Sequence, residues 1–319
     1  MSQTRSGGQV LVAGSANADM VVRAARIPAP GETVLGGDLA VVPGGKGANQ
    51  AVAAARAGGA SVSMLLALGQ DEAGDVLEQS LTEAGVRLHV VRSTRPTGAA
   101  LITVSDAAEN AITVAPGANA TLAPEHLPDL SGVEWLALQL ETPIDTVTAY
   151  AQAARAAGAR VMLNVAPARA VPPALLAATD VLVANEDELA LIAGRDGSII
   201  DRLASLGAAI AIVTLGARGC CAWHSAGVVL QPAFRVEAVD TTAAGDTFCG
   251  ALVAAFARGD ALPLALRTAS AAAALTTTRP GAQSSIPDRA AVDALLATAS
   301  DGDVAALARY CGLTTDLIE

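Results

Sequence analysis

The chain has 319 residues and a formal net charge of −11, so its surface is acidic. Nucleic-acid backbones and anionic membranes select basic surfaces, and the charge therefore argues against both kinds of partner. Hydrophobic residues make up 52% of the chain but aromatic residues only 2%, so the core must be packed from Ala, Val and Leu, and stacking on nucleobases is not expected.

Short apolar runs alternate with longer helical patterns along most of the chain. The first elements predicted are strands at 10–13 and 61–67 and helices near 48–58 and 72–84. After residue 130 the alternation predicts strands at 133–138, 160–165, 180–183 and 209–214, helices at 144–157 and 186–193, and a mainly helical last third from about 245 to 310. This order is typical of an α/β fold in which helices cover a mostly parallel sheet.

Two segments, 18–43 and 97–115, break the alternation. They carry period-2 patterns and turn residues, which predict β-structure of another kind. Inserted in a parallel sheet, they would form a small lid over the carboxyl ends of its strands, where open α/β sheets bind ligands. The alternative is a pair of ordinary edge hairpins. The remaining segments, 1–17, 44–96 and 116–319, would form the α/β body.

The cysteines and histidines argue against a metal centre built on thiolates or imidazoles. The four cysteines include no C-x-x-C spacing, and the three histidines stand far apart in the sequence. Neither the N-terminus nor any later stretch has the pattern of a targeting or membrane-spanning segment. We therefore expect a soluble, cytoplasmic protein without a membrane partner.

Lys46 is the only lysine of the chain, and every other basic position is arginine. It lies in the glycine-rich run 44–49, which leads into a predicted helix. Glycines remove Cβ atoms where backbone N–H groups approach a ligand, and a helix N-terminus favours anions and polar groups. A need for a compact ammonium on a flexible stem would explain why arginine is not used here. The alternative is an ordinary glycine turn before a helix, in which the single lysine occurs by chance in a chain whose composition favours arginine.

A second motif, 239–248, places small residues and an acid at the start of an apolar helix. The backbone N–H groups of Ala243, Ala244 and Gly245, together with the helix dipole, could stabilise negative charge on a transferred group. Asp246 could accept a proton from an attacking hydroxyl beside them. Taken alone, Asp246 could be only a capping or first-turn residue. Neither motif has the spacing of a P-loop or Rossmann fingerprint.

Both motifs resemble signatures of the PfkB carbohydrate-kinase family, in its ribokinase branch: 44–51 is similar to the first and 240–248 to the second. Shorter similar segments lie across roughly residues 10–297, at 14–19, 30–33, 117–119, 139–141, 164–168, 185–188, 214–219 and 279–282. The resemblance implies a ribokinase-like three-layer α/β sandwich with a mostly parallel sheet and a small β lid. It also implies an ATP-dependent sugar kinase, with the 5-hydroxyl of D-ribose as the first choice of acceptor.

Alternative functions stay open at this point. Within the same family, the acceptor could be deoxyribose, another pentose, a hexose or a nucleoside, although few aromatic residues are available to sandwich a base. The chain could instead be a sugar-binding sensor that has lost catalysis. The presence of Lys46, Asp240 and Asp246 argues against a sensor.

The resemblance implies roles residue by residue. Asp246 would be the catalytic base, with the anion hole at Ala243, Ala244 and Gly245. The sugar would be bound by Asn17, Ala18, Asp19, Gly45, Lys46, Gly47, Ala48, Asn49, Glu141 and Asp246. ATP would be bound by Asn185, Glu188, Thr214, Leu215, Gly216, Ala217, Arg218, Gly219, Gly245 and Ser270. Asn185 and Glu188 would also help to position Mg²⁺, through water.

A monovalent cation, usually K⁺ in the family, is a further implied cofactor. Its site would be formed by Asp240, Thr242, Thr276, Arg279, Gly281 and Ser285. We also expect a homodimer in which paired lids cover each other's sugar sites, because a half-apolar lid would expose a sheet edge or face in a monomer. Within the last segment, 298–319, residues 304–310 have helical spacing, which predicts a packed terminal helix, and the segment has no predicted functional role.

Overall fold

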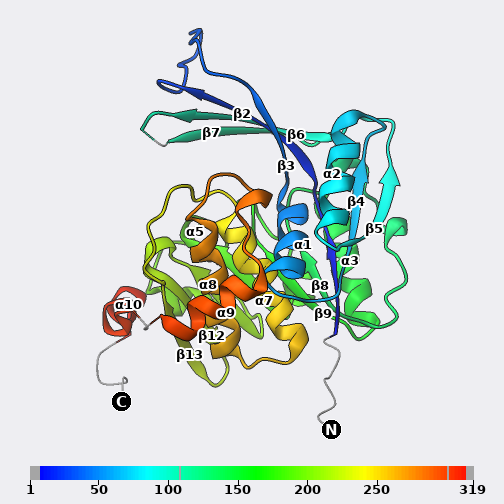
Figure 1. The fold of residues 1–319 in the computed structure, drawn as a ribbon. Coiled ribbons are helices and arrows are strands. Elements are labelled where there is room, and N and C mark those ends of the chain that lie inside the picture. Colours follow the sequence, from blue (N-terminus) through cyan, green and yellow to red (C-terminus); the bar gives the residue numbers. More distant parts are fainter. Residues whose placement is uncertain (1–7, 108, 300–301, 314–319) are drawn as a thin grey trace.

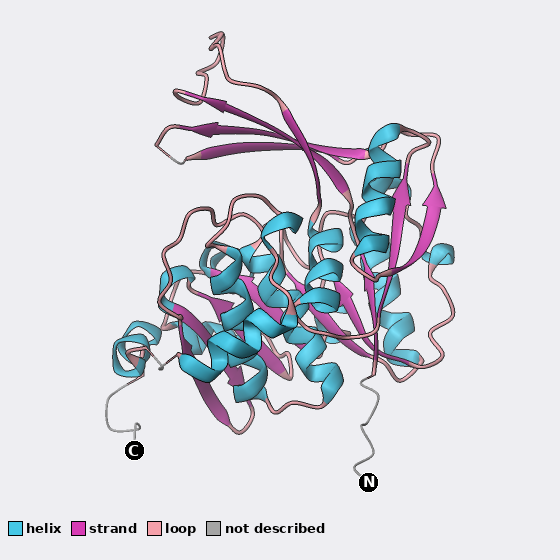
Figure 2. Ribbon diagram, viewed as in Figure 1, coloured by secondary structure: helices cyan, strands magenta, loops and turns pink. Residues whose placement is uncertain are grey.

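The computed structural model describes residues 8–107, 109–299 and 302–313, so the first seven residues of the predicted body lie outside the described part. It contains a large and a small β-sheet, with helices packed on both faces of the large one (Figures 1 and 2). In the described part, no helix is both long and apolar enough to cross a bilayer. The predicted three-layer α/β sandwich is confirmed.

The large sheet has nine strands in the order β13-β12-β11-β10-β9-β8-β1-β4-β5. Every neighbouring pair from β11 to β5 is parallel, and the pairs β11–β12 and β12–β13 at one edge are antiparallel. The strands are β1 (Gln9–Ala13), β4 (Val62–Leu68), β5 (Arg87–Arg92), β8 (Val133–Leu138), β9 (Arg160–Asn164), β10 (Val181–Asn185), β11 (Ile210–Thr214), β12 (Gly219–His224) and β13 (Gly227–Pro232).

Two apolar clusters, one on each face of the large sheet, form the core. One face is covered by α1 (Lys46–Arg56), α2 (Glu72–Glu83), α7 (Ala244–Arg258), α8 (Leu262–Thr276) and α9 (Arg289–Thr298). The other is covered by α3 (Ile144–Ala156), α4 (Pro173–Ala177), α5 (Glu186–Ala193), α6 (Ile199–Ser205) and α10 (Val304–Cys311). Single 3₁₀ turns lie at Gly117–Thr121, Pro124–His126, Gly216–Arg218 and Gln283–Ser285.

Helices α1 and α7 carry the two sequence motifs and pack closely against each other. Their facing residues are mostly Ala and Gly, and a Cβ atom at Gly250 would lie 2.4 Å from the carbonyl oxygen of Gln50. Small side chains let the two backbones approach. The N-terminus of each helix is thereby held near the other.

The small sheet has the strand order β3-β2-β6-β7 and is built from the two segments that break the βα alternation. Its strands are β2 (Asn17–Ala24), β3 (Ala40–Gly44), β6 (Gly98–Ser105) and β7 (Asn110–Ala115). It projects from the body above α1 and α7 (Figure 1). The four strands form one sheet of their own rather than edge hairpins of the large sheet.

The predicted elements are present, with ends that differ by a few residues. The helix predicted near 48–58 begins earlier, at Lys46, and the strand predicted at 180–183 runs on to Asn185. The sequence patterns missed β5 and the β12–β13 hairpin. β5 and β13 lie at the two sheet edges and are partly exposed, so their apolar pattern is weak, whereas β12 lies between β11 and β13 and is largely buried.

Candidate active site

The polar residues singled out in the sequence gather where the central parallel strands end. Ser15 and Asn17 follow β1, and Glu141 follows β8, while α1 and α7 begin at the same edge of the sheet. Loops that follow parallel strands open on one edge, which is where α/β sheets bind ligands. The small sheet lies over this edge (Figure 1).

The Glu141 carboxylate joins three segments at the side of the site where the sugar residues are predicted. Its Oε2 accepts hydrogen bonds from Ser15 Oγ at 2.5 Å, Lys46 N at 3.2 Å and Asn17 Nδ2 at 3.4 Å. Asn17 Oδ1 in turn accepts from Asn119 Nδ2 at 2.8 Å. The start of α1 is thus tied to the loop after β1 by one acid.

The Asp246 carboxylate is oriented by two amides of α1. Asn49 Nδ2 donates to Oδ2 at 3.0 Å, and Gln50 Nε2 donates to Oδ1 at 3.1 Å. Gln50 is held by Gln139 Nε2, which donates to its Oε1 at 2.7 Å. Asp246 is buried, so this network fixes its direction at the mouth of α7.

Two glycines of the first motif allow α1 to begin against the loop after β1. Gly45 has φ of 90°, and a Cβ atom there would lie 2.6 Å from the backbone nitrogen of Asn17. A Cβ atom at Gly47 would lie 2.7 Å from the backbone of Ser15. The positive φ at Gly45 and the close approach of both glycines to the backbone after β1 require glycine at these positions. Lys46 is thereby held next to the loop after β1.

The sugar side carries several buried or half-buried acids around one lysine. Burial raises the pKa of Asp19 to about 7, and the nearby Glu141 and Asp246 carboxylates act in the same direction, while Lys46 opposes them. Burial lowers the pKa of Lys46, but the carboxylates of Asp246, Glu141 and Glu188 outweigh it, so this pKa lies above its ordinary value. Lys46 therefore stays charged, while Asp19 is poised to change its protonation state.

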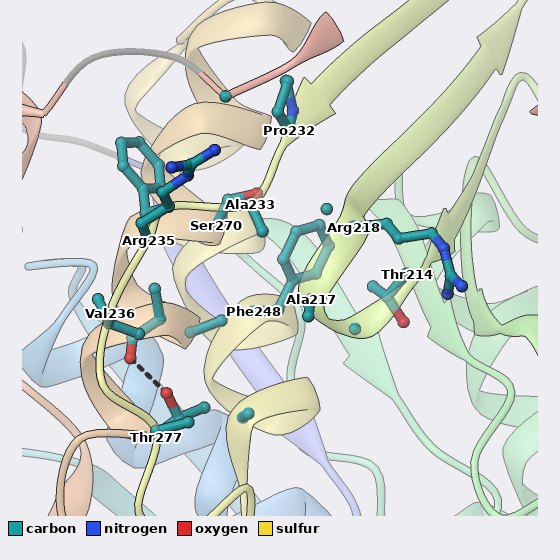
Figure 3. Close-up of a pocket in the computed structure, with 18 of the residues that line it drawn as sticks. Thr214, Ala217, Arg218, Pro232, Ala233, Arg235, Val236, Phe248, Ser270 and Thr277 are labelled. Atoms are coloured by element: carbon teal, nitrogen blue, oxygen red, sulfur yellow. Dashed lines mark hydrogen bonds between the residues drawn. The ribbon is translucent and has the colours of Figure 1, made fainter. Parts of the chain in front are cut away.

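A cavity of about 880 Å³ opens on the other side of the α7 N-terminus (Figure 3). Its size suits a ligand as large as a nucleotide. Its wall includes the turn after β11, the segment after β13 and the facing sides of α7 and α8, among them Thr214, Arg218, Phe234, Arg235, Gly245, Phe248 and Ser270. A Cβ atom at Gly245 would meet nothing within 4 Å, so the start of α7 faces open space.

The backbone at the start of α7 has a strained residue. Ala243 adopts the left-handed conformation, with φ of 59°, just before the helix begins. The N–H of Ala244 donates a long hydrogen bond of 3.3 Å to Thr241 O in this structure. Strained non-glycine residues of this kind cluster at functional sites. Here the left-handed conformation of Ala243 changes the chain direction directly before the first turn of α7.

The loop before α7 is tied to the loop after α8. Asp240 Oδ2 accepts from Gly281 N at 2.9 Å, and Asp240 Oδ1 accepts from Thr242 N at 2.9 Å. Burial would raise the pKa of Asp240, but these hydrogen bonds outweigh it and hold the pKa below its ordinary value. The backbone N–H groups of Val239 and Asp240 also donate to Thr277 O. The segments predicted to share a monovalent cation are therefore neighbours.

A sequence model of the pfkB family carbohydrate kinases matches residues 8–289. The chain belongs to this family. Ribokinase of Haemophilus influenzae is 38% identical over 291 residues, which cover 87% of this chain and 95% of that protein. The crystal structure of Thermotoga maritima ribokinase matches with a TM-score of 0.85 at 36% identity, over 91% of this chain and 100% of that one. The structure of Arabidopsis thaliana ribokinase complexed with ribose and ATP matches with a TM-score of 0.82 at 31% identity, over 91% of this chain and 99% of that one.

The PfkB fold of this chain brings most of the predicted sugar and catalytic residues together. Asn17 and the backbone of Lys46 are hydrogen-bonded to Glu141, and Asn49 is hydrogen-bonded to Asp246. Asp19 lies on β2 at the base of the lid, close enough to Glu141 and Asp246 to feel their charge. Ala18 and Ala48 are buried and contribute backbone and packing at these positions.

The predicted ATP residues divide into two groups. Those that line the cavity are Thr214, Gly216, Ala217, Arg218, Gly219, Gly245 and Ser270. Leu215 is buried in the core beneath the turn. Asn185 and Glu188 form the capping box of α5: Asn185 Oδ1 accepts from Glu188 N, and Glu188 Oε2 accepts from Asn185 N, both at 2.8 Å. Burial raises the pKa of Glu188, with Asn185 and Lys46 acting against it.

The predicted cation residues lie near the hydrogen bond that joins the loop before α7 to the loop after α8. Asp240 and Gly281 are in direct contact. Thr276 is buried, and its hydroxyl donates to Thr247 Oγ1 at 3.0 Å, while Ser285 is buried and donates to Ala282 O. Arg279 is exposed.

Sequence reasoning assigned no role to three groups of residues that the structure brings to the site. Gln50 and Gln139 orient Asp246, and Asn119 orients Asn17. Helix α10 lines the nucleotide-sized cavity. Gln50, Gln139 and Asn119 could have been found in the sequence as amide side chains inside apolar stretches, because buried amides must be hydrogen-bonded.

Proposed function

We propose that this enzyme is an ATP-dependent ribokinase that transfers the γ-phosphoryl group of ATP to the 5-hydroxyl of D-ribose. The observation that carries the proposal is the position of Asp246 and the α7 N-terminus between a polar sugar-sized network and a nucleotide-sized cavity. The similarity to ribokinases over nearly their whole length supports the same activity. The relative from Arabidopsis thaliana is complexed with ribose and ATP, and it supports the choice of substrates.

In the proposed reaction, Asp246 accepts the proton of the 5-hydroxyl as its oxygen attacks the γ-phosphorus. The bond from the γ-phosphorus to the bridging oxygen breaks, ADP leaves, and the protonated carboxyl later returns its proton to solvent. The hydrogen bonds from Asn49 and Gln50 hold the carboxylate in one orientation. Backbone N–H groups at Ala243 to Gly245 and the α7 dipole would stabilise the charge that builds on the transferred group.

Sugar hydroxyls would be recognised by groups that have unused hydrogen-bonding capacity. Asn49 Oδ1 is buried and has no partner among the described residues, so it suits a hydroxyl donor. The Asp19 carboxyl can accept or donate near neutral pH because its pKa is raised to about 7. Leaving such buried groups unpaired penalises a sugar that lacks the matching hydroxyl.

Mg²⁺ would be held with the ATP phosphates near Asn185 and Glu188, through water. Both side chains already make the α5 capping box, which leaves further lone pairs of the Glu188 carboxylate for a bridging water. When bound, Mg²⁺ would neutralise charge on the phosphates. Asn185 and Glu188 would then act by orienting water, and the remaining ligands would come from phosphate oxygens.

A monovalent cation, K⁺ in our proposal, would be held by the Asp240–Thr242 loop together with Thr276, Arg279, Gly281 and Ser285, mainly through backbone carbonyls. The close contact of the two loops and the ionised character of Asp240 suit a cation. When bound, it would shape the backbone before the α7 N-terminus. The strained conformation of Ala243 in that backbone makes its geometry sensitive to such support.

The lid, 18–43 and 97–115, is proposed to act as a dimerisation unit on the body formed by 1–17, 44–96 and 116–319. Its strands expose the large apolar side chains of Val41, Leu101, Ile112 and Val114, and the loop before β3 exposes Leu39. Pairing with the lid of a second copy would cover them and would close both sugar sites. We also expect the enzyme to act in the cytoplasm, and the four cysteines, all unpaired and buried, agree with a reducing compartment.

The test is a coupled ADP-release assay with Mg²⁺-ATP and a panel of acceptors: D-ribose, deoxyribose, other pentoses, hexoses and nucleosides. The proposal expects the highest kcat/KM with D-ribose and a 5-phosphate product. A higher kcat/KM with another acceptor would correct the substrate. Binding of ribose without turnover in the presence of ATP would favour the sensor.

A further inference from the structure

Helix α10 lies beyond the part of the chain that matches the family, yet it borders the nucleotide-sized cavity. The family match ends at residue 289, and α10 spans Val304–Cys311. The cavity wall includes Gly302, Asp303, Ala306, Leu307 and Tyr310. The helix thus borders the cavity although it lies outside the residues that the family model matches.

The inner face of α10 fixes it to the body. Leu307 and Cys311 belong to the apolar cluster on the sheet face that α3 to α6 also cover, and Ala308 is fully buried. The thiols of Cys311 and of Cys221 on β12 are close neighbours there. The helix therefore forms a fixed wall of the cavity, and Leu307 is both packed in the core and part of that wall.

Tyr310 connects α10 to two charged residues of the ATP side. The guanidinium carbon of Arg218 lies 4.2 Å from the centroid of the Tyr310 ring, which is a cation–π contact. The Tyr310 hydroxyl donates to Glu186 Oε1 at 2.7 Å. The Tyr310 side chain thus contacts the Arg218 guanidinium with its ring face and the Glu186 carboxylate with its hydroxyl.

We propose that α10 is part of the nucleotide site and that Tyr310 is a positioning residue, which holds the Arg218 guanidinium at the cavity wall for the polyphosphate of a nucleoside triphosphate. The inference rests on the proposed function. A chain with a net charge of −11 repels a polyphosphate unless cations are fixed where it binds. Arg218 and Glu186 contact the same side chain and so lie within reach of each other. By binding Glu186 through its hydroxyl, Tyr310 keeps that acid from pairing with Arg218.

The test compares Tyr310→Ala and Tyr310→Phe with a control on the same helix, Arg309→Ala, whose side chain is exposed and does not line the cavity. Binding of ADP is measured by calorimetry, and the KM values for ATP and ribose by ADP release. Tyr310→Ala is expected to weaken ADP binding and raise the KM for ATP by about fivefold, the size of an exposed cation–π contact. The KM for ribose and kcat should stay within about twofold, and Tyr310→Phe should keep most of the affinity because the ring remains.

A double-mutant cycle separates positioning from a purely structural role. If Tyr310 acts through Arg218, then Tyr310→Ala should change ADP binding little in an Arg218→Ala background. Equal effects in both backgrounds, or unchanged ADP binding in folded Tyr310→Ala, would overturn the inference. If Tyr310→Ala does not fold, Ala306→Trp is used instead. An indole on the exposed, cavity-lining side of α10 should raise the KM for ATP alone. An unchanged KM for ATP would refute the inference. Wild-type protein that binds ADP but does not phosphorylate ribose would contradict the proposed function and would leave the ADP-binding comparison intact.

Discussion

Replacing Asp19 by asparagine should change how the stability of the ligand-free protein depends on pH. Burial and the neighbouring carboxylates raise the pKa of Asp19 from 3.8 to about 7. A raised pKa means that the folded state binds the proton more tightly, so this contribution to stability is complete below about pH 4 and is lost as the pH rises through about 7. Each pKa unit is worth about 1.4 kcal/mol, so the shift of about three units corresponds to about 4 kcal/mol.

The assay is urea unfolding of wild-type protein and Asp19→Asn between about pH 4 and about pH 8. The stability of the variant relative to wild type should rise with pH by about 3–4 kcal/mol across this window, because asparagine has no charge to lose. Asp145→Asn, which also removes a carboxylate but on the exposed first turn of α3, is expected to keep the wild-type dependence. Parallel stability curves for wild type and Asp19→Asn would refute the reasoning.

The other predictions concern catalysis and assembly. Asp246→Asn should lower kcat by two to four orders of magnitude, in the range of a lost general base, with ribose binding largely kept; turnover within a few-fold of wild type would contradict its role. Lys46→Arg should lower kcat/KM by about tenfold with little change in unfolding free energy, because the planar fork does not fit between Gly45 and Gly47; a fully active variant would make the lone lysine an accident of composition. Activity should rise when K⁺ replaces Na⁺ in an Mg²⁺-ATP assay, and equal rates in Li⁺, Na⁺ and K⁺ would count against the cation site. Light scattering at micromolar concentration should give the mass of a dimer, and a monomer would rule out pairing through the lid.

Local pattern was enough to predict the architecture of the body. Buried strands such as β4 and β8 are short and mostly apolar, and the helices between strands have helical spacing, so the βα alternation is visible without any contact information. In the hairpin β12–β13, β13 is an edge strand with a weak apolar pattern, and β12 is a short, largely buried run that begins with small residues after a glycine turn. The bounds of α1 were displaced because Lys46 and Gly47 do not resemble the start of a helix until the loop after β1 is packed against them.

The candidate site was predicted where its chemistry is carried by residue type, and missed where it is carried by tertiary contacts. Lys46 and Asp246 stand out in sequence because of their glycine-rich and small-residue surroundings. Gln50 has no such marker, and its contact with Asp246 exists only because α1 packs against α7. Tyr310 approaches Arg218 because α10 packs on the sheet, which no local pattern predicts.

The two halves of the site differ in charge, and the difference matches the two proposed substrates. On the proposed sugar side, Asp19, Glu141 and Asp246 surround the single ammonium of Lys46, so acids are in excess; burial and then these acids raise the pKa of Asp19. A neutral polyol suits this side because it brings hydroxyl donors without adding negative charge. On the cavity side, Arg218 and the α7 N-terminus supply the positive potential that a polyphosphate requires.

Asp246 lies at the boundary between these halves, and that position separates the expected effects of substitutions. In the proposed reaction, a proton leaves the sugar at the same place where negative charge arrives on the phosphoryl group, so changes at Asp246 or Gly245 would alter the transition state and should act on kcat. Changes at Glu141 would act on groups proposed to hold the sugar in both ground and transition states, and changes at Tyr310 would act on the proposed nucleotide binding. Changes at Glu141 should therefore act on the KM for ribose, and changes at Tyr310 on the KM for ATP. A sugar-binding sensor has no turnover and would show neither effect.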